Sequence, residues 1–182
     1  MKLVRRRFDT PGGPMMALAS DDSLCALEFW KPGRMNRLDA RLRRFFEPFE
    51  IEDGTNAVIA QTSEWLGRYF AGDRPEDPQL DVRGAAFELK VWAAHRQIPL
   101  GQTTSYGEIA RHLGAPGAPR AVGMANGANP IAIIVPCHRV IGSNGTLTGY
   151  GGGLVRKKWL LDHERGQRTL TDLCDTQPAA PR

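Results

Sequence analysis

The pattern of hydrophobic and polar positions changes twice in the first half of the chain. Between residues 3 and 30, the β-prone pieces MMALAS and LCALEFW are separated by the turn-forming stretches TPGGP and SDDS. Short apolar runs bounded in this way predict a β-meander. Helical periodicity follows at 38–46, which is rich in arginine, and again at 56–70. The segment 71–84 concentrates proline, aspartate and glycine, so we expect a domain boundary there.

Three helices are predicted in the second half, two of them with clear start signals. AAFELKVWAAHRQI repeats apolar residues at helical spacing. SYGEIARHLGA opens with Ser105 and has Glu108 three positions later, a capping box that starts a helix. After the break GAPGAP, the stretch PRAVGMANGAN begins another helix with Pro119 near its first position. Helix, short turn and helix in this order indicate a helix-turn-helix motif.

A hairpin is predicted after this motif. IAIIVP, residues 131–136, is a β-branched apolar run typical of a buried strand. Asn144 and Gly145 form a dipeptide that favours a tight hairpin turn. LVRKKWLLDHER, residues 154–165, predicts an amphipathic basic helix that closes the domain. A helix-turn-helix followed by a hairpin indicates a winged-helix-like architecture.

Charge divides the chain in the same way as the pattern. The 182 residues are 41% hydrophobic and 24% charged, as expected for a globular protein. Residues 1–83 hold 13 Lys and Arg against 14 Asp and Glu, whereas residues 84–170 hold 10 against 4. A basic second half beside a neutral first half favours contact with a polyanion, although an ordinary solvated surface has the same composition.

Several classes of protein are disfavoured by the sequence. No apolar run reaches the length of a membrane span, and the first residues lack the apolar core of a secretory signal. We therefore expect a cytoplasmic protein without membrane contact. The three cysteines are odd in number and have no CxxC spacing, which argues against a disulfide framework or a zinc knuckle.

The candidate chemistry lies in IAIIVPCHRVIGSNGTLTGYGGG, where Cys137 directly precedes His138. A thiol needs a base to become the nucleophilic thiolate, and a carboxylate on the other ring nitrogen would stabilise the imidazolium. Among the carboxylates of the second half we favour Glu164. A Cys-His pair alone also fits a structural role. The other candidate carboxylates are Glu88, Glu108 and Asp162.

The second helix of the predicted helix-turn-helix carries few side chains that could read base edges. Beside Arg120 it offers Ala121 and Gly123, and Asn126 is almost the only other polar residue. Small residues let a backbone approach a partner closely, as in a narrow DNA groove. Tight packing between helices also explains the same pattern, and without further evidence it is the simpler explanation.

Five motifs together resemble a known family. SYGEIA, RAVG, NP, PCHRVIG and TGYGGG follow one another along the chain and are similar, in this order, to motifs of the O6-alkylguanine-DNA alkyltransferases, also called methylated-DNA–protein-cysteine methyltransferases. The likeness is closest to the bacterial single-protein forms and covers residues 81–164. It implies an α+β fold with a small ribonuclease H-like domain at 1–80 and a winged-helix-like domain at 81–170. We expect a disordered tail at 171–182.

The resemblance also implies roles for the residues of the reactive centre. Cys137 would accept the alkyl group from the O6 atom of guanine, and His138 would deprotonate it through a bound water. Glu164 would orient the imidazole, Asn129 would brace the active-site turn, and Tyr106 would donate to the guanine ring. Because a thioether is a poor leaving group, each molecule would act once.

The remaining implied roles concern DNA and the alkyl pocket. Arg120 would fill the gap left by a flipped nucleotide, with the small-residue helix in the minor groove. The Val140 carbonyl would accept from the exocyclic amine, and Ser143 would contact the departing oxygen. The pocket wall would be formed by Tyr150, Gly151 and Gly152, and the DNA-binding set is Arg120, Ala121, Gly123 and Asn126.

The expected partner is double-stranded DNA that contains O6-alkylguanine, with O4-alkylthymine as a second substrate, and the expected protein is a monomer. We expect no cofactor and no metal, because the chain before Gly84 has one cysteine and no histidine. Glycine at 151, where some relatives have serine, would widen the range of alkyl groups. Two alternatives are a non-catalytic winged-helix lesion binder or regulator and a cysteine hydrolase, although nothing in the sequence indicates the oxyanion hole of a hydrolase.

Overall fold

A four-stranded sheet organises the first half of the protein. The computed structural model describes residues 1–46 and 48–166. The strand order is β3-β2-β1-β4, with the first three strands antiparallel and β4 parallel to β1. The predicted meander is therefore confirmed, whereas β4 was not predicted. The strands are β1 (Lys2–Phe8), β2 (Met15–Ala19), β3 (Leu24–Phe29) and β4 (Glu50–Asp53).

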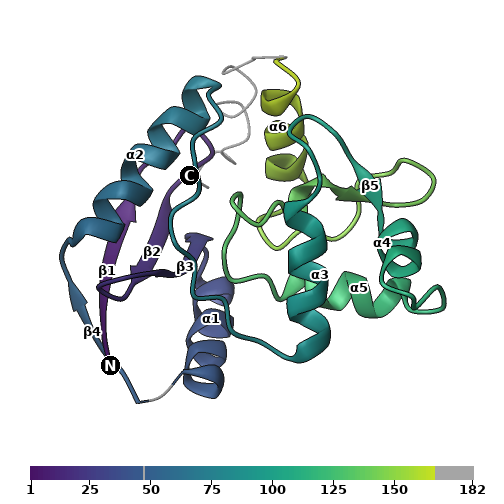
Figure 1. Ribbon diagram of the computed structural model, residues 1–182. Helices are drawn as coiled ribbons and strands as arrows, with labels where there is room; N and C mark the ends of the chain where they lie inside the picture. Colours follow the sequence, from purple (N-terminus) through teal and green to yellow (C-terminus); the bar gives the residue numbers. More distant parts are fainter. Residues whose placement is uncertain (47, 167–182) are drawn as a thin grey trace, which may run out of the picture.

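One helix packs on each face of this sheet (Figure 1). Helix α1 (Pro32–Phe45) starts before the predicted residue 38, because Pro32 supplies a favourable first residue. Its apolar side packs on residues of β2 and β3. Helix α2 (Ala57–Ala71) packs on the opposite face, and the Asn56 side chain caps it by accepting from the Ile59 amide at 2.9 Å.

The second half is mainly helical and lies beside the sheet (Figure 1). The capping box before α4 is present, with the Ser105 hydroxyl accepting from the Glu108 amide at 3.1 Å. Helix α5 has Pro119 at its first position, as predicted. The elements are α3 (Ala86–Arg96), β5 (Thr104–Ser105), α4 (Tyr106–His112), α5 (Pro119–Gly127), the 3-10 helix η1 (Cys137–Arg139), β6 (Val140–Ile141) and α6 (Leu154–Glu164).

The predicted strand at 131–136 is wrong. Ile131 forms only an isolated bridge to Leu27, and the following residues form buried turns. Ile133 has a φ of 71°, which no strand contains. The apolar run is buried as expected, but its backbone is bonded within a turn, where the Val135 amide donates to the Ile131 carbonyl at 3.1 Å.

The predicted hairpin is also wrong, although its turn exists. The Gly142 amide donates to the Thr146 carbonyl at 2.9 Å, and Gly145 has the positive φ of 78° that favours glycine. Strand β6 before the turn pairs in parallel with β5 and has no antiparallel partner among the described residues. Asn144 and Gly145 therefore lie in a tight turn, but no pair of antiparallel strands flanks this turn among the described residues.

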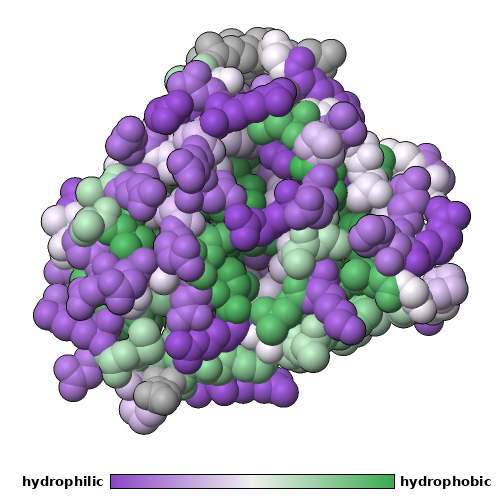
Figure 2. Space-filling model, in the orientation of Figure 1, coloured by the Kyte–Doolittle hydropathy of each residue, from purple (hydrophilic) through white to green (hydrophobic). Residues whose placement is uncertain are grey.

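A hydrophobic core crosses between the two halves. One cluster contains residues of β2, β3 and α2 together with Val91, Val122 and Ile131 of the second half. The Ala132 amide donates to the Leu27 carbonyl at 2.6 Å, which ties the turn before Cys137 to β3. Apolar residues reach the surface in the middle of the view, where the halves meet (Figure 2). The expected tail at 171–182 lies outside the described residues.

Candidate active site

A turn held by Asn129 presents Cys137. The Asn129 amide nitrogen donates to the carbonyls of Val135 at 2.8 Å and Ile131 at 3.2 Å, and its oxygen accepts from the Ile131 amide at 3.0 Å. Cys137 follows as the first residue of η1 and is 6% exposed. Three bonds from this one buried side chain fix the irregular backbone that leads into Cys137, so Asn129 sets the position of the cysteine.

Burial keeps the Cys137 thiol protonated. It raises the pKa of the thiol to about 11, outweighing a hydrogen bond with Asn129 that lowers the pKa. Nearby Glu28 raises the pKa further, while Arg34 and Lys157 lower it. At neutral pH this sulfur needs a base before it can attack an electrophile.

A histidine–glutamate pair begins at the residue after Cys137. His138 Nε2 lies 2.7 Å from Glu164 Oε1, and both side chains are fully buried. The same carboxylate accepts from Tyr69 Oη at 2.8 Å, from Arg139 Nε at 2.8 Å and from the Gly101 amide at 3.2 Å. Burial alone would raise the pKa of Glu164, but its hydrogen bonds with His138 and Arg139 prevail and hold that pKa well below its usual range. Glu164 is therefore an anion.

The surroundings also fix the tautomer of His138. Because ionised Glu164 only accepts hydrogen bonds, Nε2 must carry the proton of this pair. Nδ1 has no hydrogen-bond partner among the described residues, so its lone pair is available. Burial lowers the pKa of His138, although Glu164 acts against this. The ring is thus a neutral base with one accepting nitrogen.

The loop after Cys137 and helix α6 surround the thiol with polar groups. Tyr106 Oη donates to the carbonyls of Thr148 at 3.1 Å and Gly149 at 3.3 Å. Lys157 Nζ donates to the Val140 carbonyl at 2.5 Å and to the Thr148 carbonyl at 2.7 Å. Burial lowers the pKa of Lys157 to about 8 and raises the pKa of Tyr106. Lys157 thus holds the carbonyl of Val140, which keeps a second lone pair for another donor.

The predicted pocket residues take different positions. Tyr150 is half-buried, its hydroxyl is buried without a partner among the described residues, and desolvation raises its pKa well above the usual range. Ser143 is exposed on the turn. A Cβ atom at Gly151 would collide with the Arg34 guanidinium, so the first half of the chain occupies the space that this glycine leaves. At Gly152 a Cβ atom would come within 2.6 Å of the Tyr150 ring.

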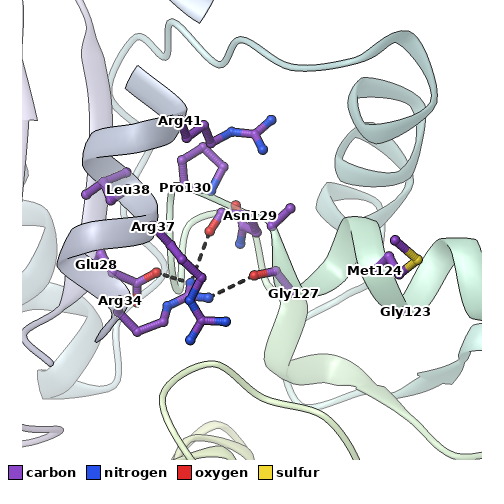
Figure 3. A pocket seen from close by; sticks show the side chains of 11 residues that line it. Glu28, Arg34, Arg37, Leu38, Arg41, Gly123, Met124, Gly127, Asn129 and Pro130 are labelled. Atoms are coloured by element: carbon purple, nitrogen blue, oxygen red, sulfur yellow. Dashed lines mark hydrogen bonds and ion pairs between the residues drawn. The ribbon is translucent and has the colours of Figure 1, made fainter. Parts of the chain in front are cut away.

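Arg34 joins α1 to the end of α5 (Figure 3). Its guanidinium pairs with Glu28, which is 3% exposed, and donates to the Gly127 carbonyl at 2.8 Å and the Asn129 carbonyl at 3.4 Å. A cation at these carbonyls satisfies the free acceptors at the helix end. Arg34 therefore supports the segment that contains Asn129.

The predicted DNA-binding residues all lie on α5, but they differ in how far they are exposed to solvent. Arg120 is exposed, while Ala121 and Gly123 are half-buried, and Gly123 lies near the Tyr106 ring. Asn126 is 3% exposed, so the fold does not present its side chain to the surface and its expected DNA contact does not fit this arrangement.

Sequence reasoning missed four residues of this centre: Tyr69, Arg139, Lys157 and Arg34. Two of them left a signal: Lys157 falls on the apolar side of its helix together with Leu160 and Leu161, and Arg139 lies within the motif PCHRVIG. No group of three or more His, Cys, Asp or Glu side chains suited to a metal lies within 1–46 and 48–166. No helix in these ranges is long and apolar enough to cross a membrane.

Comparisons with known proteins agree on one family. The family model described as 6-O-methylguanine DNA methyltransferase, DNA binding domain, matches residues 86–166. A methylated-DNA–protein-cysteine methyltransferase of Mycobacterium tuberculosis is 62% identical over 164 residues, which are 89% of this chain and 92% of that protein. The protein of the same name from Salmonella typhimurium is 46% identical over 169 residues, which are 90% of this chain and 96% of that protein.

A solved structure extends the likeness to three dimensions. The crystal structure of Mycobacterium tuberculosis OGT in complex with DNA is similar with a TM-score of 0.78 and 43% identity, over 93% of this chain and 97% of that chain. Fold and site define a mixed α+β protein with a buried cysteine next to a histidine–glutamate pair. The chain belongs to the family of methylated-DNA–protein-cysteine methyltransferases. The resemblance in the sequence motifs is thereby confirmed.

Proposed function

We propose that this protein repairs DNA by transferring the alkyl group of O6-alkylguanine directly to Cys137. The observation that carries the proposal is the buried Cys137 directly before His138, whose Nε2 is held by Glu164 and whose Nδ1 has no hydrogen-bond partner in the part of the chain that the structure describes. The names of the relatives state a methyl transfer from methylated DNA to a protein cysteine. They favour this reaction over a lesion binder or regulator without transfer.

The reaction begins with removal of the thiol proton. His138 Nδ1 takes this proton, directly or through one water, and the Glu164 carboxylate stabilises the imidazolium that forms. The Cys137 thiolate attacks the alkyl carbon, so that an S–C bond forms and the C–O6 bond breaks. Negative charge develops on the leaving guanine, and Tyr106 Oη gives up its carbonyl acceptors to donate to the ring.

The damaged base must leave the duplex to reach the thiol, since Cys137 is 6% exposed. Helix α5 lies in the minor groove, where its small residues permit close approach, and Arg120 fills the vacated stack. O4-alkylthymine presents a similar alkyl ether and is a second substrate. The product thioether does not release its alkyl group, so each molecule reacts once.

The finer assignments of fold and location also belong to this proposal. The order of α4, α5 and the turn at 142–146 supports a winged-helix-like domain at 81–170, and the sheet with α1 and α2 supports a ribonuclease H-like domain at 1–80. Two free cysteines, Cys25 and Cys137, suit a reducing compartment and hence a cytoplasmic protein.

Intact-mass analysis after incubation with an oligonucleotide that contains O6-methylguanine tests the transfer. We expect one added methyl group per molecule, no addition in Cys137→Ala, and full addition in Cys25→Ala. Each molecule should gain no more than one group when lesion is in excess. Retained DNA binding with an unchanged mass would refute the transfer and support the lesion-binding alternative.

A further inference from the structure

A cavity of about 360 Å³ separates α1 from α5 (Figure 3). Three arginines of α1 line it from one side: Arg34, Arg37 and Arg41. From the other side it is lined by small or exposed residues of α5, among them Gly123, Met124 and Gly127. The family model that describes a DNA binding domain begins at residue 86, so α1 lies outside it.

Two of the three arginines form ion pairs with carboxylates, and the third does not within the described residues. Arg34 pairs with the buried Glu28, and Arg41 Nη2 lies 2.6 Å from Glu88 Oε2. Exposed Arg37 has no ion pair with any residue in 1–46 or 48–166, and its Nε donates only to the Gly33 carbonyl at 3.2 Å. The cavity thus has one cation whose terminal nitrogens remain available to an incoming anion.

The α5 side of the cavity is open. Met124 is 77% exposed, and a Cβ atom at Gly127 would meet nothing within 4 Å. Helix α5 contains no acidic residue that would repel an anion. A minor groove occupied by this helix is bordered by two sugar–phosphate backbones, and one of them would pass on the side of α1.

We propose that α1 contributes to DNA binding, with the Arg37 guanidinium contacting a backbone phosphate of the strand that borders α5. This inference rests on the proposed function, since it places α5 in the minor groove. The contact positions the duplex and reads no base, because phosphates are the same at every nucleotide. It makes the first half of the chain part of the DNA interface.

The test is the salt dependence of binding to an undamaged duplex. Neutralising one phosphate contact changes the slope of log affinity against log salt by about 1. Arg37→Gln should therefore flatten the slope by about 1 and weaken binding at low salt, whereas Arg37→Lys should keep the slope. The matched control is Arg43→Gln, a loss of the same charge on the same helix from a residue that pairs with Asp39 and does not line the cavity.

A second reaction separates this inference from the proposed function. Alkylation of Cys137 by free O6-benzylguanine requires no DNA and reports transfer alone. Equal slopes for Arg37→Gln and Arg43→Gln would overturn the role of α1 even if transfer occurs. A flattened slope without any alkylation would retain the contact and refute the transfer. Equal slopes with a dimer that dissociates in Arg37→Gln would assign the cavity to a second copy instead.

Discussion

The Glu164 carboxylate, which pairs with His138, is held by side chains from both halves of the chain. Glu164 receives donors from His138 and Arg139 of the second half and from Tyr69 of α2. Tyr69 is 3% exposed and stacks on Trp65 with ring centroids 5.2 Å apart. Its hydroxyl is thus fixed on Glu164 Oε1, the same oxygen that faces the histidine. Tyr69 is a positioning residue, since it acts through Glu164.

Tyr69→Phe removes this one donor and preserves the aromatic ring. Loss of a hydrogen bond to a buried carboxylate should slow alkylation of Cys137 by roughly tenfold, about 1.4 kcal/mol. The pKa of Glu164 would rise, and its stronger attraction for a proton would raise the pKa of His138. The acidic limb of the rate profile should therefore move to higher pH, as measured with free O6-benzylguanine.

Trp65→Phe is the control, because it alters the packing of Tyr69 and leaves its hydroxyl in place. If both variants gave the wild-type pH profile with equally reduced rates, Tyr69 would serve packing only.

The residues that sequence reasoning found and those it missed differ in how they make contact. Cys137 and His138 are adjacent in the chain, and Glu164 was one of only four carboxylates in the second half. Tyr69 and Arg34 contact the site across 95 and 93 positions. Neither has a local pattern, because both sit in ordinary amphipathic helices. Only the folded arrangement could show them.

At the scale of single elements, helices were predicted best because their ends carry their own signals. Ser105 with Glu108 fixed the start of α4, and Pro119 fixed that of α5. Strand β4 was missed because all four of its residues are exposed and show no apolar alternation. The error at 131–136 arose because burial of an apolar run does not distinguish a strand from a turn that a buried asparagine holds.

The cap of α4 can be tested for its own contribution. Ser105→Ala removes the acceptor of the Glu108 amide and should lower the free energy of unfolding by about 1 kcal/mol. Ser63→Ala, at an exposed position within α2, should change it by less than about 0.5 kcal/mol. Denaturant unfolding of both variants gives the comparison. Equal stabilities would mean that tertiary packing alone fixes the start of α4.

At the scale of the whole molecule, α3, the first helix of the second half, carries an unusual buried group. His95 is fully buried, and neither ring nitrogen has a hydrogen-bond partner within the described part of the chain. Burial, with a smaller effect of His138, lowers the pKa of His95 to about 4. The ring is neutral in the folded protein and protonates readily in the unfolded chain.

Stability should therefore fall on acidification from about pH 6.5 to about pH 4. In this range the unfolded state binds a proton that folded His95 does not, so unfolding becomes more favourable, by up to about 3 kcal/mol in total. His95→Leu should flatten this part of the curve of unfolding free energy against pH. A smaller slope should remain, because the pKa of His138 is lowered as well.

The control for this measurement is His112→Gln, an exposed histidine on α4. It should leave the curve as in the wild type. An unchanged slope in His95→Leu would mean that another group takes up the proton.

Arg34 of α1 and Tyr69 of α2 contact residues of the second half, so the second half cannot be separated from the first without losing these contacts. A fragment of residues 86–166 alone would contain Cys137 and His138. In that fragment Glu164 would lack the hydrogen bond from Tyr69, and the Gly127 carbonyl at the end of α5 would lack the one from Arg34. The segment around Ile131, which packs against β3 in the whole protein, would be exposed to solvent. The smallest part of this chain that keeps the site intact is therefore larger than the segment that contains the family motifs.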